Sequence, residues 1–182
     1  VAKLKAKGRN PGTPWKKQSD LIQIDEARDY ISDRGDEIWR ILESKGIRNV
    51  ILTGVHTNMC VIGRPFGLRQ MARNGKNVVL MRDMTDAMYN PKRWPYVSHF
   101  TGTALIVAHI ERYLCPTMTS DQIVGGEPFR FQSDTNAQPQ SDFARAYLAG
   151  EASPKQEGTY EDRWMLVNVP SAWESLPNLR HY

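Results

Sequence analysis

The spacing of hydrophobic and polar positions predicts helices and strands that follow one another in α/β order. Residues 33–45 have helical spacing, with Ile38, Ile41 and Leu42 on one face and acidic side chains in the first turn. Residues 49–53 are a continuous apolar run, which is typical of a strand buried on both faces. The first part of the chain therefore predicts an amphipathic helix followed by a buried strand.

The same order continues along the chain. A second helix is predicted over residues 60–73, and a second doubly buried strand over residues 77–81. Two strands joined by one helix within so few residues form a parallel unit with a right-handed crossover. A third helix is predicted over residues 97–113, where Pro116 prevents its continuation. The predicted fold class is a three-layer α/β/α arrangement with a central parallel sheet.

The composition changes along the chain and predicts three parts. Residues 1–19 read as a basic extended arm, because Lys, Gly and Pro dominate them. Residues 20–130 contain the α/β domain, and residues 131–182 read as a linker and an irregular C-terminal extension. Within this extension, residues 163–170 have the composition of a strand.

The positive charge is concentrated in the arm. The chain has 182 residues and a net charge of +4, and six of its 24 basic residues lie within residues 1–17, which contain no acid. The remaining 18 basic residues face 20 acidic ones, so the rest of the chain is close to neutral. This distribution, without a nucleic-acid-binding motif, argues against a nucleic-acid partner. The first residue is Val1, from which we expect a longer natural chain.

No apolar run reaches the roughly 18 residues that a membrane helix needs, so no membrane partner is expected. The two cysteines, Cys60 and Cys115, lie in different local contexts and do not resemble a disulfide framework. This usage is typical of a reducing compartment and predicts a cytoplasmic location.

The loop after the first strand carries the strongest chemical signal. It runs from Gly54 to Cys60 and delivers the cysteine to the amino end of a helix, where backbone N–H groups and the helix dipole stabilise a thiolate. The same N–H groups can receive the oxygen of a tetrahedral intermediate. The alternative is that Cys60 is a small buried hydrophobic residue, as many unpaired cysteines are.

The segment Ile51–Val61, ILTGVHTNMCV, resembles the nucleophile loop of the isochorismatase-like cysteine hydrolases, a superfamily that includes nicotinamidases. In that family an apolar strand leads to a glycine and then to a Cys-Val pair that opens a helix. The chain has Gly54 and Cys60 in these places, followed by a second strand that ends near Asp83. The resemblance covers about residues 20–115.

The resemblance implies that Cys60 is the nucleophile in the hydrolysis of a small amide or related C–N bond. It also implies that the backbone amides of His56 and Cys60 hold the oxyanion, with a cis peptide bond between Val55 and His56. Asn58 is a candidate substrate-binding residue. No cofactor and no metal are expected, the partner is a small-molecule substrate, and family members usually self-associate, which implies a homo-oligomer.

Arg64 is the second candidate substrate-binding residue. Pro65 follows it and disturbs the start of the helix, which leaves Arg64 able to turn toward the pocket and hold a carboxylate. The alternative is that Arg64 and Arg69 are surface residues or pair with Asp83 and Asp86.

The chain departs from the family upstream of the cysteine. The family has an Asp base at the end of its first strand and a Lys close to the sulfur, and no residue of this chain matches either. The alternative function is therefore a non-catalytic binding or assembly module that keeps the fold.

Overall fold

The computed structural model describes residues 5–8, 19–134 and 142–151. The contacts divide the chain into two units, residues 1–32 and residues 33–182. Among the described residues, no helix is long and apolar enough to cross a membrane. The strand predicted over residues 163–170 lies outside the described residues.

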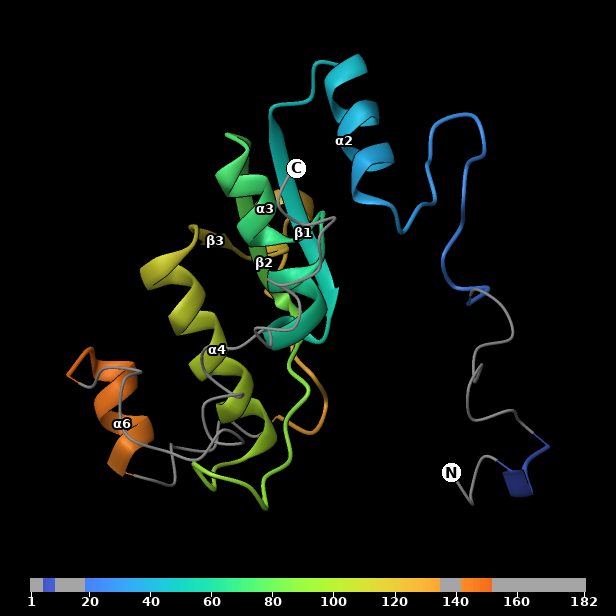
Figure 1. Ribbon diagram of the computed structural model, residues 1–182. Coiled ribbons are helices and arrows are strands. Elements are labelled where there is room, and N and C mark those ends of the chain that lie inside the picture. Colours follow the sequence, from blue (N-terminus) through green and yellow to red (C-terminus); the bar gives the residue numbers. More distant parts are fainter. Residues whose placement is uncertain (1–4, 9–18, 135–141, 152–182) are drawn as a thin grey trace. The chain divides into compact units, whose positions relative to one another are not determined.

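The second unit contains a parallel sheet of three strands in the order β1-β2-β3 (Figure 1). These strands are β1 (Asn49–Val55), β2 (Asn77–Asp86) and β3 (Thr117–Met118). The α/β class with a parallel sheet is therefore confirmed, although β2 is longer than predicted and β3 was not predicted. The β1–β2 register changes between Leu52 and Gly54, and Gly54 pairs with Thr85 instead of a residue near Arg82.

The first strand is not buried on both faces, contrary to the prediction. Its residues alternate between exposed and half-buried, with Ile51 46% and Val55 64% exposed. In the described part of the chain β1 pairs only with β2 and lies at the edge of the sheet. The apolar run reflects a β-branched strand with one partly covered face.

The helices follow the predicted order with different bounds. They are α2 (Gly35–Ser44), the π-helical turn η1 (Thr57–Val61), α3 (Leu68–Arg73), α4 (His99–Tyr113), α5 (Asp121–Val124) and α6 (Asp142–Ala149). The single helix predicted over residues 60–73 is wrong, because the chain turns between Arg64 and Gly67 before α3 begins. Pro65 lies in this turn and cannot donate a helical hydrogen bond.

One apolar core lies between the sheet and the helices. Val78 and Leu80 of β2 point into it, and α3 and α4 pack against β2. The core also contains Ala144 and Tyr147 of α6, both fully buried. The prediction of an irregular extension is therefore wrong for residues 142–149, which form a helix that completes the core.

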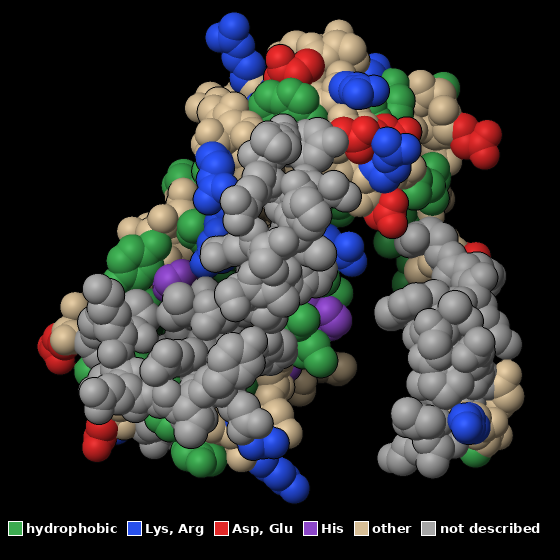
Figure 2. All heavy atoms as spheres, viewed as in Figure 1, with side chains coloured by type: hydrophobic (Ala, Val, Ile, Leu, Met, Phe, Trp, Pro, Cys, Tyr) green, Lys and Arg blue, Asp and Glu red, His purple; other side chains and the backbone are tan. Residues whose placement is uncertain are grey.

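The loop between α3 and β2 holds α2 in place. The ammonium group of Lys76 donates to the Glu43 carboxylate and to the Ile47 carbonyl, each at 2.6 Å, and lies 4.6 Å from the centre of the Trp39 ring. The opposite face of α2 is polar, and acidic and basic side chains lie next to one another around it in Figure 2. The helix is thus amphipathic, as its spacing predicted.

Candidate functional site

The chain leaves β1 through a tight turn that relies on positive φ angles. Gly54 has φ 113° and His56 has φ 63°. The cis peptide expected between Val55 and His56 is wrong, since the only cis bond among the described residues precedes Pro95. The left-handed conformation of His56 turns the backbone instead, and its carbonyl accepts from the amides of Met59 and Val61.

Two buried polar side chains of η1 fasten this turn to the end of β2. The Thr57 and Thr85 hydroxyls are 2.6 Å apart, and Thr85 donates to the Gly54 carbonyl. The Asn58 side chain donates to the Met88 carbonyl at 3.2 Å and accepts from the Met88 amide at 2.9 Å. Asn58, a predicted substrate-binding residue, therefore uses its donor and its acceptor to hold the loop after β2.

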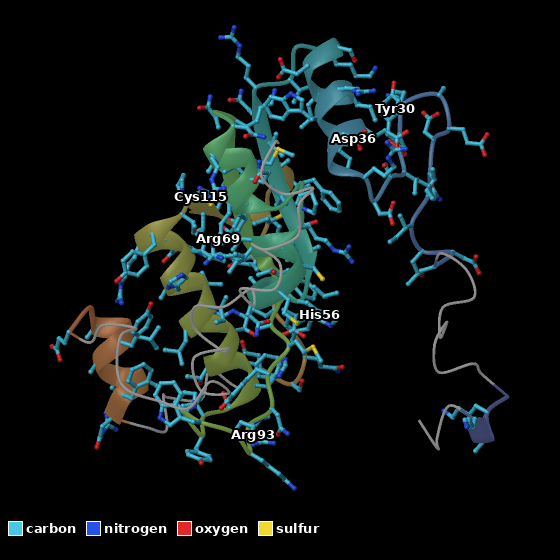
Figure 3. All side chains as sticks on the ribbon, in the orientation of Figure 1. Tyr30, Asp36, His56, Arg69, Arg93 and Cys115 are labelled. Atoms are coloured by element: carbon cyan, nitrogen blue, oxygen red, sulfur yellow. The ribbon has the colours of Figure 1, made fainter. Side chains whose placement is uncertain are left out.

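Cys60 lies in the first helical turn after β1, and the residue is half-buried. His56 is exposed at the carboxyl end of β1 (Figure 3). The second cysteine has a different environment. Cys115 is buried, and burial raises the pKa of its thiol despite a hydrogen bond from the Leu80 amide. Of the two thiols, only Cys60 is placed to meet a solute.

Arg64 lies four residues after Cys60, and its amide donates to the Cys60 carbonyl at 3.1 Å. Its side chain and that of Arg69 are half-buried. Asp83 accepts hydrogen bonds from Ser120 and Phe129, and Asp86 accepts from His99 and Thr103. The four predicted site residues, His56, Asn58, Cys60 and Arg64, lie in or next to η1 because they are close together in the sequence.

The loop after β2 contains a polar cluster that the sequence interpretation missed. Asp86, at the end of β2, accepts from His99 Nε2 at 2.7 Å and from the Thr103 hydroxyl at 3.2 Å. His99 Nδ1 lies 3.0 Å from the Tyr89 carbonyl. Both nitrogens of the His99 ring thus have a polar partner, which fixes the orientation of the ring.

Asp83, which precedes this cluster on β2, has a structural role. Burial alone would raise the pKa of its carboxyl. Hydrogen bonds from the Ser120 hydroxyl, the Ser120 amide and the Phe129 amide outweigh burial and hold the pKa below its ordinary value. Asp83 therefore fixes α5 and the following segment against the sheet.

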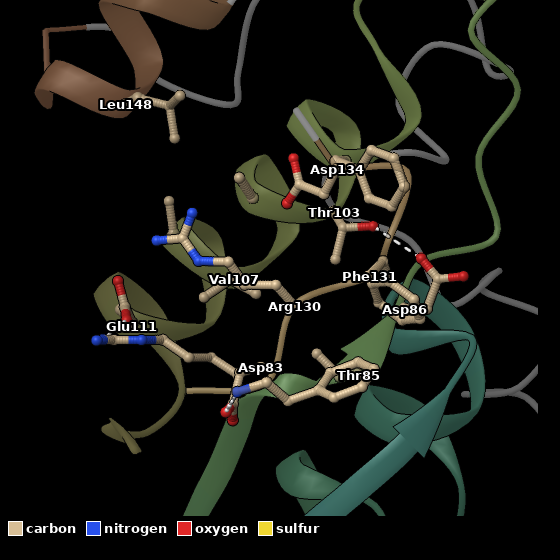
Figure 4. Close-up of a pocket in the computed structure, with 15 residues that line it drawn as sticks. Asp83, Thr85, Asp86, Thr103, Val107, Glu111, Arg130, Phe131, Asp134 and Leu148 are labelled. Atoms are coloured by element: carbon tan, nitrogen blue, oxygen red, sulfur yellow. Dashed lines mark hydrogen bonds and ion pairs between the residues drawn. The ribbon is translucent and has the colours of Figure 1, made fainter. Parts of the chain in front are cut away.

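A hollow of about 410 Å³ lies between the end of β2, one side of α4 and residues 129–134 (Figure 4). Thr85, Asp86 and Thr103 line it, together with Phe rings and α4 side chains. Cys60 does not line it. The hollow and the cysteine thus lie on two loops at the same end of the parallel sheet, which is where open α/β sheets bind ligands.

Neither a metal centre nor a known relative adds to this geometry. Within residues 5–8, 19–134 and 142–151, no group of three or more His, Cys, Asp or Glu side chains is arranged to hold a metal ion. No protein-family model, curated protein or solved structure matches the chain.

Proposed function

We propose that the chain is a cysteine-dependent hydrolase of the isochorismatase-like type, which cleaves a small amide or related C–N bond. The Cys60 thiolate attacks the amide carbon, a C–S bond forms, and the C–N bond breaks as the nitrogen takes up a proton and leaves. Water then hydrolyses the thioester, which releases the carboxylic acid and returns the thiol. No cofactor takes part in these steps.

The observation that carries this proposal is the position of Cys60. This half-buried residue lies in the first helical turn after a parallel strand, where backbone N–H groups and a helix dipole favour negative charge. The amides of His56 and Cys60 are the proposed oxyanion donors. The left-handed φ of His56 supports this assignment, because such strain collects at functional sites.

A second function, a non-catalytic binding module, is favoured by a different observation. The hollow beside Asp86 lies apart from Cys60, and the buried polar side chains next to the cysteine hold the fold. A module of this kind binds its ligand on the loop after β2 and makes no use of the thiol.

Alkylation by iodoacetamide across a range of pH tests the proposal. We expect Cys60 to react faster than an ordinary thiol below about pH 8.5, and the Cys115→Ser variant to behave like the unchanged chain. Ammonia release from a panel of small primary amides should be lost in Cys60→Ser and kept in Cys115→Ser. An alkylation midpoint at or above about 8.5, with no amide hydrolysed, overturns the hydrolase and favours the binding module.

A further inference from the structure

Three phenylalanines form a connected wall beside Asp86. The rings of Phe100 and Phe131 have centroids 5.8 Å apart, and those of Phe129 and Phe131 are 5.2 Å apart in an edge-to-face arrangement. Phe129 is 46% and Phe131 37% exposed. All three rings line the 410 Å³ hollow, so a flat ligand entering it would cover aromatic surface that water now contacts.

One side of α4 supplies small and aliphatic lining residues as well as Phe100. Ala104, Val107 and Ala108 line the hollow there, and Leu148 of α6 also lines it. A ring that enters the hollow therefore meets both aliphatic and aromatic side chains. The volume lies within the range typical of small-ligand pockets, about 300–1,000 Å³.

The charges around the hollow favour a cation over an anion. Four carboxylates line it, Asp83, Asp86, Glu111 and Asp134, against the guanidinium groups of Arg82 and Arg130. Acids still outnumber bases by one when His99 is counted as a cation. Arg82 is engaged by Glu111 and Thr117.

The geometry points to a binding site for a small aromatic cation in this hollow, with the ring against Phe131 and the N–H donors turned toward Asp86, whose hydrogen bonds from His99 and Thr103 both go to Oδ1. Phenylalanine rings attract cations through their negative faces, and carboxylates accept from N–H groups, so both features favour the same chemical class. The site is independent of the proposed hydrolase, because Cys60 does not line the hollow.

Benzamidine and benzoate are matched probes, since they share a ring and differ in the sign of the charge. In a titration of the full chain followed by amide NMR, we expect benzamidine to shift the signals of residues 129–131 and 103–108 in a saturable manner. Benzoate should bind at least about fivefold more weakly, because the lining is acidic.

Two variants locate the site. Phe131→Ala removes the exposed ring, and Ala104→Leu adds bulk from an exposed position on α4; each should weaken benzamidine binding about fivefold or more. Ile51→Ala is the matched control, because Ile51 is as exposed as Phe129 and lies outside the hollow. Circular dichroism confirms that each variant is folded before it is titrated.

Three results overturn the proposal: benzoate binding as tightly as benzamidine, no saturable shift with benzamidine, or shifts unchanged in both Phe131→Ala and Ala104→Leu. Benzamidine binding that is unaffected by Cys60→Ser supports the site whether or not any amide is hydrolysed. Failure of the hydrolase and failure of this site are therefore distinguishable.

Discussion

Each end of α4 carries a histidine, and the two histidines have opposite surroundings. At the amino end, His99 is half-buried and faces an acceptor at each ring nitrogen, the Asp86 carboxylate and the Tyr89 carbonyl. This end adjoins the hollow, and His99 is held in place by a polar partner at each ring nitrogen.

At the carboxyl end, His109 is buried in the core and has basic neighbours. Its Nδ1 lies 3.4 Å from the Tyr147 hydroxyl, and its ring packs against Tyr113. Burial, followed by the positive charges of Arg69 and Arg112, lowers the pKa of His109 to about 4. This end of the helix therefore favours a neutral ring.

The difference shows that position on a helix does not decide the role of a histidine. Residues 99 and 109 belong to one continuous helix, and what separates them is the elements that pack against each end. The end of β2 supplies a carboxylate to the first, whereas the second has Tyr147 of α6 and the cations Arg69 of α3 and Arg112 of α4 beside it. The predictions below test this contrast.

The largest expected effect is a loss of stability in mild acid caused by His109. Its pKa is about 4 in the folded chain and 6.5 in the unfolded chain, so the unfolded state binds more protons between these values. The free energy of unfolding should thus fall by up to about 3 kcal/mol as the pH decreases from 6.5 to 4. Urea unfolding at several pH values measures it.

The matched controls for this effect are glutamines at the two ends of α4. His109→Gln should remove most of the slope between pH 4 and 6.5, because glutamine does not titrate there. His99→Gln should keep the slope. Equal slopes in His109→Gln and the unchanged chain would contradict the assignment of His109 as the buried neutral histidine.

A methyl group added near the amino end of α4 should have the next largest effect. A Cβ at Gly102 would lie 2.2 Å from the Tyr89 ring, whose hydroxyl donates to the Arg93 carbonyl and accepts from the Val97 amide. We expect Gly102→Ala to destabilise the fold by about 1–3 kcal/mol through overpacking, despite alanine's better helix propensity. The Tyr89→Leu variant should reduce this penalty, and an equal penalty in both backgrounds would show that Tyr89 is not the obstacle.

The cap of α4 provides a smaller test at the same end. The Ser98 hydroxyl oxygen accepts from the Thr101 amide at 3.0 Å, so Ser98→Ala should reduce the free energy of unfolding by about 1 kcal/mol. Ser98→Asp keeps an acceptor there and should stay within about 0.3 kcal/mol of the unchanged chain. A similar loss in both variants would mean that the cap contributes little. Thermal unfolding measures both.

The sequence predicts the elements of this fold better than it predicts their surroundings. The helix at residues 33–45, the strands β1 and β2 and the end of α4 before Pro116 were identified, because periodicity and the special backbones of Gly and Pro act locally. The burial of β1 was misjudged, since β-branched residues suit both an edge strand and a central one.

The residues near the site also differ in whether the sequence could predict them. Cys60 was found because a strand, a glycine turn and a helix are contiguous in sequence. Asp86 and His99 were missed as a pair, because their contact depends on how the loop after β2 returns to α4. Tyr147 was assigned to an irregular extension, since a helix of eight residues has few periodic positions and its burial depends on α4.

The smallest expected effect concerns the Asp86–His99 pair itself. The two side chains are 31% and 33% exposed, so water screens their attraction and the pair should contribute only about 0.5–1 kcal/mol. A double-mutant cycle with Asp86→Asn and His99→Gln isolates this coupling from the other bonds of each residue. A coupling between charges should shrink when salt is raised to about 1 M, because salt screens the attraction. A coupling unchanged by salt would show that the pair is a neutral hydrogen bond, and the contrast between the two ends of α4 would then rest on burial alone.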